Sequence, residues 1–342
     1  MLEPSGLSGR KEDLADWRWK WSKLIEEVRE IIKKAGYDSY ELSSPEVIKS
    51  CCFDIIARKD ARLLLVKVLL NIDNFLAEHA EELKAFANLL IGIPLVIGKH
   101  TKREEIPPGV LYERFGVPVL NPETFREWIS HDEIVYAYVQ RGGHFVKLDG
   151  SKLKQLRMEQ GLSASEIAQK VGVSRRAVYA YERGEMDAKS EVVEKLKDIL
   201  DSEDFIVRLD FPLRWKTPSI LQEKRAIRLR SKLAKDIDEY FTRLGFQLYW
   251  AKKAPFDALA SVLREKVSLT GVEEPKEKRL EVRIHTVDEI SKVVNRRAIF
   301  MVENEKIIDQ IEPLESVSVL TVEEAKKKEK NELKELLTEA DR

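Results

Sequence analysis

Apolar residues near the start of the chain recur every three or four positions, a spacing that places side chains on one face of an α-helix. The pattern begins at about Leu14 and stops at Gly36, a residue type that commonly follows the last helical turn. Its apolar positions are Trp17, Trp21, Leu24, Val28, Ile31 and Ala35. Residues 1–13, rich in glycine, serine and charge, predict a flexible leader in front of this helix.

Shorter apolar runs separated by turn-type residues follow the helix and predict strands. These runs lie at residues 52–57, 63–70 and 93–98, with a short one from Val117. Helices are predicted over 77–90 and from Pro122, with Asn121 as its cap, to Ser130. A hairpin is expected to turn at Gly142-Gly143. This alternation predicts an N-terminal mixed α/β domain over 14–149.

The C-terminal part of the sequence shows a similar mixture of strand and helix patterns. Strand-like runs lie at 205–209, 279–284 and 298–303, and helices are predicted from Thr217 to Gly245 and over 287–295. These elements predict a second α/β domain over 204–320. The last segment, 321–342, opens with a capping box of Thr321 and Glu324 and carries Glu–Lys pairs four residues apart. It therefore predicts a charged, solvated helix.

Two landmarks recur in the same order in both α/β regions. A helix ends in glycine and an aromatic residue, at Gly36-Tyr37 and at Gly245-Phe246. A Phe-Asp pair follows, at Phe53-Asp54 and at Phe256-Asp257, and strand, helix and strand patterns come next. This order is consistent with a divergent internal repeat. It is equally consistent with two unrelated α/β domains whose elements happen to follow the same order.

Residues 150–203 are helical in short pieces and contain the most specific motif of the chain. Ser163 and Glu166 form a capping box that opens one short helix, a tight turn follows at Gly172-Val173, and Ser174 caps a second helix. Residues that can face the core are Ile167, Ala168, Val171, Val178 and Tyr181, and residues that can point outward are Arg175, Arg176 and Tyr179. Two short helices joined by a glycine-containing turn, with basic residues opening the second, are typical of a helix-turn-helix.

The segment AQKVGVSRRAVYAYERG, within 150–203, resembles the helix-turn-helix of the Cro and lambda-repressor superfamily. Members of that superfamily are small five-helix DNA-binding domains of transcription regulators, and the motif here covers about 163–182. The resemblance implies that the recognition helix, Ser174–Arg183, enters the major groove. The DNA-binding residues that it implies are Ser163, Ala164, Ser174, Arg175, Arg176, Tyr179 and Arg183.

The resemblance also assigns a role to each part of this set. Arg175 and Arg176 would read base edges, with Tyr179 beside them, because a guanidinium fork matches O6 and N7 of guanine. Ser163 and Ala164 would approach phosphate through N–H groups at a helix start.

A structural ion pair between Arg157 and Glu182 is implied in the same way. The alternative reading is a small helical subdomain whose two outward arginines are only solvated.

Charge is balanced over the whole chain and uneven within it. The 342 residues include 59 Lys and Arg and 60 Asp and Glu, a net charge of −1, which gives no overall reason to bind nucleic acid. Residues 151–185 nevertheless hold seven basic side chains against four acidic ones, and residues 212–253 hold eleven against four. The second excess fits either a surface that follows a DNA backbone or the solvated face of a packed helix.

Other protein classes find no support in the sequence. No apolar run is long enough to cross a bilayer, and the first residues lack the apolar core of a signal peptide. The adjacent Cys51 and Cys52 cannot form a disulfide framework, and the five histidines show no pair at metal-ligand spacing. We therefore expect a cytoplasmic protein with no membrane partner, cofactor, metal, catalytic residue or small-molecule ligand.

The two α/β regions also resemble the restriction-endonuclease-like fold, in which an Asp and an acid-x-Lys on the next strand hold magnesium. Asp54 fits the first position, but Leu65-Val66-Lys67 offers no second carboxylate, so the N-terminal region resembles a scaffold that has lost catalysis. Asp257 is followed by Glu281-Val282-Arg283 on a predicted strand, with arginine in place of lysine. The simpler reading of Glu281 is an exposed residue of an edge strand.

These observations predict a multi-domain α+β protein with a central all-α DNA-binding domain. In length and architecture it resembles the archaeal HTH-type transcriptional regulatory proteins. That resemblance implies a sequence-specific regulator that binds double-stranded DNA, as a homodimer on an inverted-repeat operator. The helix from Thr217 to Gly245 is a candidate dimer contact. A magnesium-dependent nuclease using Asp257 and Glu281, and a protein-interaction scaffold with incidental DNA binding, remain as alternatives.

Overall fold

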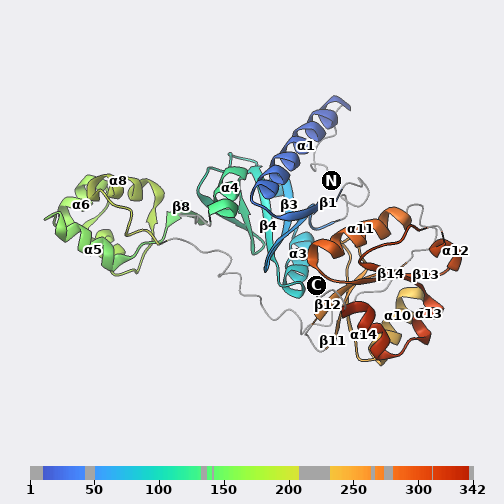
Figure 1. Cartoon of the computed structure of the whole chain (residues 1–342). Helices are drawn as coiled ribbons and strands as arrows, with labels where there is room; N and C mark the ends of the chain where they lie inside the picture. The colour runs from blue at the N-terminus through green and yellow to red at the C-terminus, as the bar shows by residue number, and fades with distance from the viewer. Residues whose placement is uncertain are drawn as a thin grey trace. The chain divides into compact units, whose positions relative to one another are not determined.

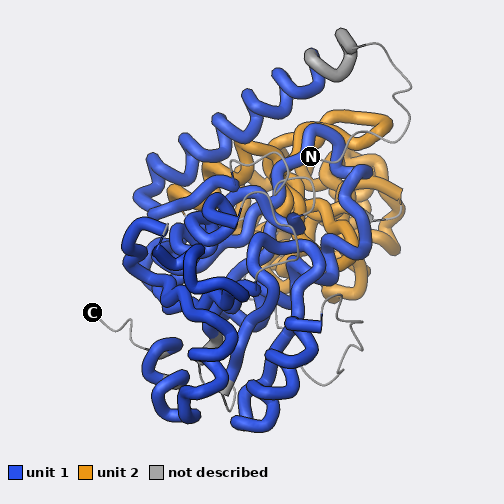
Figure 2. The backbone as a smooth tube through the Cα atoms, turned by 90° about the vertical axis from the view of Figure 1, so that its right-hand side faces the viewer, with its two compact units in different colours: residues 1–95, 217–342 blue, residues 96–216 orange. Residues whose placement is uncertain are grey.

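The computed structural model describes residues 11–42, 51–131, 137–140, 142–207, 232–262, 266–272, 280–309 and 311–338 (Figure 1). The chain divides into two compact units, unit 1 with residues 1–95 and 217–342 and unit 2 with residues 96–216 (Figure 2). Among the described residues, none of the helices combines the length and apolar character that crossing a bilayer requires. The domain boundaries predicted at residues 14, 150, 204 and 321 stay predictions.

Unit 1 begins with helix α1 (Lys11–Lys34), whose apolar stripe buries Leu24 and Val28. The chain turns after α1 at Gly36, where a φ of 79° favours glycine, so the predicted end of this helix is confirmed. Residues Lys11–Asp13, predicted as leader, belong to the helix instead, and residues 1–10 lie outside the described residues.

The first strands of unit 1 pair in the order in which the chain makes them. They are β1 (Asp38–Glu41), β2 (Ile55–Lys59) and β3 (Arg62–Asn71), all antiparallel, with Ile55 opposite Val66. The short 3-10 helix η1 (Ile72–Asn74) leads to α3 (Ala77–Leu89) and β4 (Ile93–His100), close to the predicted helix and strand. The nearly continuous burial of β3 explains why its sequence is apolar without alternation.

The second part of unit 1 is built on strands in the order β10-β11-β12-β13-β14. Its elements are α10 (Lys232–Arg243), β10 (Gln247–Trp250), β11 (Ala258–Val262), β12 (Lys266–Val272), α11 (Leu280–Val294), β13 (Ala298–Val302), α12 (Glu305–Ile308) and β14 (Val317–Thr321). Strand β12 pairs antiparallel with β11 and parallel with β13. Of the helix predicted from Thr217 to Gly245, residues 217–231 lie outside the described residues, and the described part ends at Arg243.

Two expectations for this region are wrong. The run 279–284, predicted as a strand, forms the start of helix α11 from Leu280, because Leu280, Ile284 and Val287 lie on one buried helical face while Val282 is exposed. The run 205–209 forms no strand in its described residues 205–207, where Ile206 makes only an isolated bridge with Leu148.

The C-terminal tail is less solvated than its charge predicts. Its capping box is present, since Thr321 Oγ1 accepts a hydrogen bond from Glu324 N at 3.1 Å. The segment forms two helices, α13 (Val322–Lys327) and α14 (Lys330–Thr338), in place of one. Their buried residues Ala325, Leu333 and Leu337 join the core around Phe241 and Met301, so the tail packs as part of unit 1.

Unit 2 continues from β4 into a second set of strands. They are β5 (Val110–Arg114), β6 (Val117–Leu120), β7 (Ala137–Gln140), β8 (Gly143–Val146) and β9 (Ala188–Lys189). Strand β6 lies between β4 and β5, parallel to the first and antiparallel to the second. Helix α4 (Pro122–His131) follows β6, and the predicted hairpin is confirmed by the pairing of β7 with β8.

A bundle of short helices is attached to this sheet through β9, which pairs with β8. It contains α5 (Gly150–Glu159), α6 (Ala164–Val171), α7 (Arg175–Glu182) and α8 (Ser190–Leu200). These four are the helices of residues 150–207, all of which are described, and residues 208–231 are not, so the five-helix form stays a prediction. The two ends of the bundle run side by side: Asp149 N donates to Phe205 O at 2.8 Å and Val207 N to Lys147 O at 2.9 Å.

Candidate nucleic-acid interface

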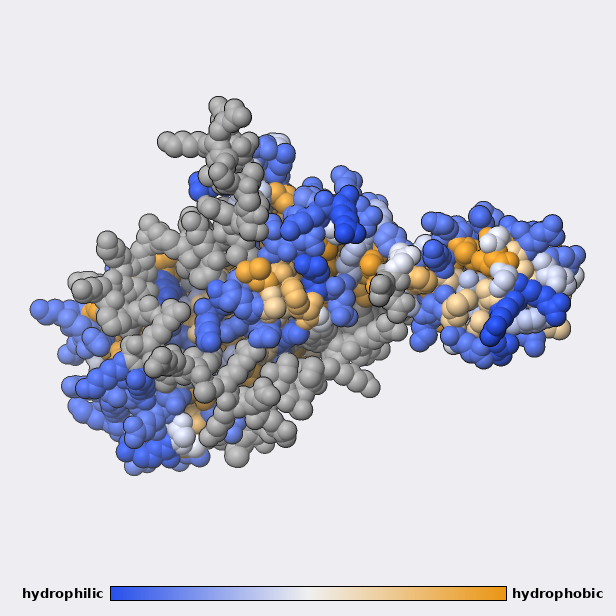
Figure 3. Space-filling view, turned by 180° about the vertical axis from the view of Figure 1, so that it is seen from behind, coloured by the Kyte–Doolittle hydropathy of each residue, from blue (hydrophilic) through white to orange (hydrophobic). Residues whose placement is uncertain are grey.

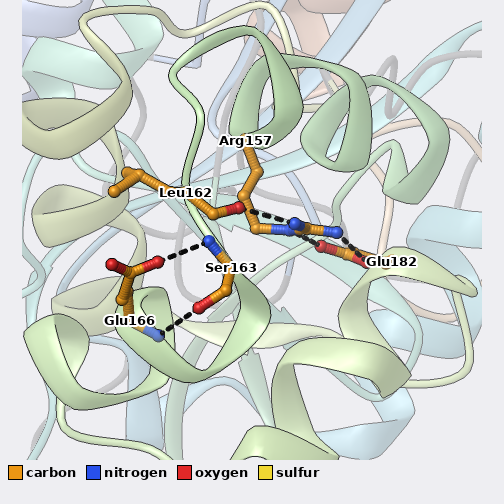
Figure 4. A network of polar contacts seen from close by, with 5 residues as sticks. All are labelled: Arg157, Leu162, Ser163, Glu166 and Glu182. Carbon is orange, nitrogen blue, oxygen red and sulfur yellow. Dashed lines mark hydrogen bonds and ion pairs between the residues drawn. The ribbon is translucent and has the colours of Figure 1, made fainter.

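Helices α6 and α7 begin where hydroxyl side chains cap them. Ser163 Oγ accepts from Glu166 N at 3.2 Å, and the Glu166 carboxylate accepts from Ser163 N at 2.7 Å, which confirms the predicted capping box (Figure 4). These bonds from Ser163 lower the pKa of Glu166. Gly172, at a φ of 79°, makes the turn, and Ser174 Oγ accepts from Ala177 N at 3.1 Å.

The inner faces of the two helices form one apolar core. The residues expected there are all buried: Ile167, Ala168, Val171, Val178 and Tyr181. Helix α5 approaches α7 so closely that only glycine fits at Gly150, because a Cβ there would lie 2.4 Å from Tyr181 O. This packing fixes which face of α7 points outward.

A charged pair locks α5 to the end of α7, as predicted. Arg157 forms hydrogen bonds through Nε and Nη2 to the carboxylate of Glu182, the second at 3.2 Å, and donates through Nη1 to Leu162 O at 2.7 Å (Figure 4). Both side chains are largely buried, and the bond to Glu182 raises the pKa of Arg157. Such a two-pronged arrangement fixes both distance and orientation between the helices.

The outer face of α7 carries the predicted arginines. Arg175 and Arg176 are exposed in its first turn, and the Arg175 guanidinium lies 5.4 Å from the ring centre of Tyr179, one turn later. Tyr179 is 37% exposed, so an aromatic face and two cationic forks share one surface. We call Arg175, Arg176 and Tyr179 the α7 outer face.

The other predicted contact residues differ from this group. Ala164 is buried, so it can offer only main-chain groups, and the N–H of Ser163 is already bonded to Glu166. Arg183, at the end of α7, is paired with Glu185 through two bonds of 2.7 Å, which raise its pKa. The charge of Arg183 is therefore largely balanced within the chain, whereas the α7 outer face carries two adjacent cations.

The nuclease-like position in the first part of unit 1 is filled by a buried ion pair. Asp54 Oδ1 accepts from Lys67 Nζ at 2.9 Å and Oδ2 accepts from Val68 N at 2.7 Å. Leu65, where a second carboxylate would stand, is buried and apolar. Among the described residues no group of three His, Cys, Asp or Glu could hold a metal ion. These residues do not fit the magnesium that a nuclease of this fold uses.

Sequence reasoning missed two further buried polar residues on α3. Glu82 accepts from Lys252 N at 3.2 and 3.3 Å, and His79 is 1% exposed. Their signal in the sequence was weak, because a polar residue inside a helical pattern predicts an exposed position. Glu281, the other candidate acid, lies exposed in the first turn of α11 and not on a strand.

Two family models match the chain at the places where these features lie. Residues 22–135 match a PD-(D/E)XK superfamily domain, and residues 153–205 match a helix-turn-helix model. The fold and the motif thus define a protein that combines a helix-turn-helix domain with a PD-(D/E)XK-type α/β domain.

Relatives of nearly the same length match this chain over most of both sequences. The Putative HTH-type transcriptional regulatory protein of Thermococcus kodakarensis is 33% identical over 92% of this chain and 98% of its own length. A protein of the same description from Pyrococcus furiosus is 33% identical over 82% of this chain and 86% of its own length. The chain belongs to this archaeal family of HTH-type transcriptional regulatory proteins.

A solved structure, the SinR protein/SinI protein complex, is 27% identical to this chain. The likeness covers 28% of this chain and 80% of that one. Its TM-score of 0.15 is too low to support any argument about fold or function.

Proposed function

We propose that the protein is a sequence-specific DNA-binding regulator that places α7 in the major groove of double-stranded DNA. The observation that carries this proposal is the α7 outer face, where two exposed arginines and a tyrosine project from a helix held by caps, core and an ion pair. Side chains that leave a rigid helix near its start can reach base edges while the helix ends contact phosphate. Arginine at that place favours guanine.

Within this proposal the contact residues divide by role. Arg175 and Arg176 read bases, Tyr179 packs beside them, and Ser174 stands at the phosphate-facing start of α7. Ser163 and Ala164 contribute main-chain groups at the start of α6. Arg183 follows the backbone after exchanging its bond with Glu185 for one with phosphate. A homodimer would present two copies of α7 to the two halves of an inverted repeat.

The test begins with selection of bound fragments from sheared genomic DNA by the full-length protein, because the target sequence is unknown. We expect recovered fragments to share a short inverted repeat that the protein protects in footprinting. The double variant Arg175→Ala/Arg176→Ala is expected to lose this footprint, since each two-pronged contact with guanine contributes about 1–3 kcal/mol.

The matched control is Lys20→Ala/Lys23→Ala, which removes two exposed positive charges from α1. It is expected to keep both the footprint and the affinity. Equal loss in both double variants would mean that binding depends on net charge alone, and an unchanged footprint without Arg175 and Arg176 would place the DNA elsewhere on the protein.

A further inference from the structure

The second part of unit 1 has the same element order as its first part. Apart from the short η1, the first part runs α1, β1, β2, β3, α3, β4, and the second runs α10, β10, β11, β12, α11, β13. The leading helix of each ends before a glycine at positive φ, Gly36 at 79° and Gly245 at 83°. In the first part, β4 pairs in parallel with β6, which leads into helix α4. In the second part, β13 pairs in parallel with β14, which leads into helix α13.

Asp54 marks a fixed point in the hydrogen bonding of the first part. Its N donates to Val66 O at 2.8 Å, and its O accepts from Leu42 N, the residue directly after β1, at 2.9 Å. Its side-chain Oδ2 accepts from Val68 N at 2.7 Å. Asp54 is thus bonded to β3 on one side and to the end of β1 on the other, and its side chain accepts from the N–H of Val68, two residues beyond Val66.

Asp257 makes the same three hydrogen bonds in the second part. Its N donates to Thr270 O at 3.0 Å, and its O accepts from Ala251 N, the residue directly after β10, at 2.7 Å. Its Oδ2 accepts from Val272 N, again two residues beyond the first partner, at 2.6 Å. Agreement of two main-chain bonds and one side-chain bond is much more specific than agreement in element order.

The two parts differ at the position opposite the aspartate. In the first part this position is Lys67, whose ammonium pairs with Asp54 at 2.9 Å. In the second it is Gly271. A Cβ at this position would lie 2.2 Å from the ring of Phe300, so only glycine fits. Arg283 supplies the cation from α11 instead, with Nη2 2.6 Å from Asp257 Oδ2. Its guanidinium lies 5.1 Å from the centre of the Phe300 ring.

The two parts also contact each other reciprocally within unit 1. From the first part, α3 presents Glu82 to Lys252 N and places Phe86 with its ring centre 5.1 Å from that of Phe256. From the second part, α11 packs on β1 and β2, where Arg58 donates a hydrogen bond to Val294 O. The corresponding helices α3 and α11 therefore each contact the other part, at its first two strands or at the segment that connects them. Such reciprocity is characteristic of a two-fold pairing of like units.

We propose that residues 232–327 are a second copy of the PD-(D/E)XK-type module, paired with the first inside one chain, and that Arg283 takes the place of a divalent cation beside Asp257. The nuclease fold implies a metal at this aspartate, and the described side chains do not fit one, since no group of three His, Cys, Asp or Glu among them could hold a metal ion. Among the described residues, the Asp257 carboxylate pairs with Arg283, whose charge neutralises it. In both copies a side-chain cation thus pairs with the aspartate, Lys67 in the first and Arg283 in the second, and the aspartates serve to hold the fold together.

The test reverses the charge of this cation in the full-length chain. Arg283→Glu would place two carboxylates together, so the variant should melt at a lower temperature than wild type in EDTA. A divalent ion of suitable size should then bridge them, and excess MnCl2 should raise the melting temperature of Arg283→Glu by about 3 °C or more. The matched variant Arg283→Gln, which removes the charge without adding a carboxylate, and the wild type should show no comparable rise.

Two results would overturn the proposal. A rise of the wild-type melting temperature in MnCl2 that Asp257→Asn abolishes would show that Asp257 is already a metal ligand. An equal response of Arg283→Glu and Arg283→Gln would show that Arg283 does not stand at a cation position. If Arg283→Glu cannot be purified, Arg283→Asp decides in the same assay, because it also places a second carboxylate beside Asp257 and should respond to MnCl2 more than Arg283→Gln does.

Discussion

His79 shows what a single buried side chain contributes to unit 1. It lies on α3 with both ring nitrogens buried, and neither finds a hydrogen-bond partner among the described residues. Burial, followed by the nearby ammonium groups of Lys67 and Lys253, lowers its pKa to about 4, while Glu78 acts in the opposite direction. The ring is therefore neutral in the folded protein at neutral pH, and protonating it favours unfolding.

This shift gives stability a defined pH dependence. An unfolded histidine has a pKa near 6.5, so between about pH 6.5 and pH 4 the unfolded chain binds a proton that folded His79 does not. Stability should consequently fall as pH decreases through this window. We expect denaturation midpoints of His79→Leu to decline less than those of wild type between pH 7 and pH 5. His131→Leu, on an exposed residue, should decline as wild type does, and equal slopes in all three proteins would contradict the assignment.

Residue-level prediction succeeded where the motif was local. The exposed positions of Arg175, Arg176 and Tyr179 are as the spacing predicted, and the pair of Arg157 with Glu182 is as the family resemblance implied. A helix-turn-helix specifies its own core, caps and outer face within some twenty residues, so spacing alone determines which residues share a face. The pairs of Asp54 with Lys67 and of Asp257 with Arg283 depend on strand register and on a distant helix, which the sequence pattern does not reveal.

At the scale of the element, helix α5 packs so closely against α7 that the position of Gly150 has no room for a Cβ atom. Alanine is the better helix former and would normally replace a helical glycine with a gain of about 1 kcal/mol. At Gly150 the methyl group would meet Tyr181 O at 2.4 Å and Glu182 O at 2.5 Å, both of which are main-chain atoms of α7. Neither can move without displacing the helix that carries the α7 outer face.

Gly150→Ala should therefore destabilise the helix bundle in spite of its favourable propensity. We expect a loss of about 1–3 kcal/mol, the range for overpacking a tight contact, read as faster amide hydrogen exchange in α5 and α7. Lys154→Ala, on an exposed position of the same helix, serves as the control and should leave exchange rates unchanged. Slower exchange in Gly150→Ala would show that α5 and α7 can separate without cost.

The misjudged start of α11 shows where element prediction reached its limit. A strand period of two residues fits the apolar positions Leu280, Val282 and Ile284. A helical period of three to four residues fits Leu280, Ile284 and Val287, so the sequence is compatible with both structures. The true strand, β12, contains the buried polar residues Ser268 and Thr270 and the glycine at position 271, and its pattern is therefore not apolar. Tertiary packing, absent from any local window, decided both cases.

At the scale of the whole molecule, the sequence was consistent with an internal repeat and equally with two unrelated α/β domains. The recurring Gly-aromatic and Phe-Asp landmarks correspond to the ends of α1 and α10 and to the aspartates held between strands. The amino-acid sequence does not reveal the hydrogen-bond register that makes Asp54 and Asp257 equivalent. The chain thus combines two α/β regions with one helix-turn-helix domain, and its balanced net charge of −1 averages over these unlike parts.

The adjacent ends of the helix bundle make it an insert that can be removed without stretching the chain. Because Asp149 bonds to Phe205 and Val207 bonds to Lys147, a short glycine–serine turn can connect residue 148 to residue 206 in place of everything between. We expect this shortened chain to keep a cooperative thermal unfolding transition and to lose DNA binding, as followed by circular dichroism and by the footprint. Aggregation of the shortened chain would show that the bundle is required for folding of its surroundings. The same geometry would let the α/β regions carry a different helix bundle at this position. The DNA sequence that the protein binds could then change in evolution while the rest of the fold was conserved.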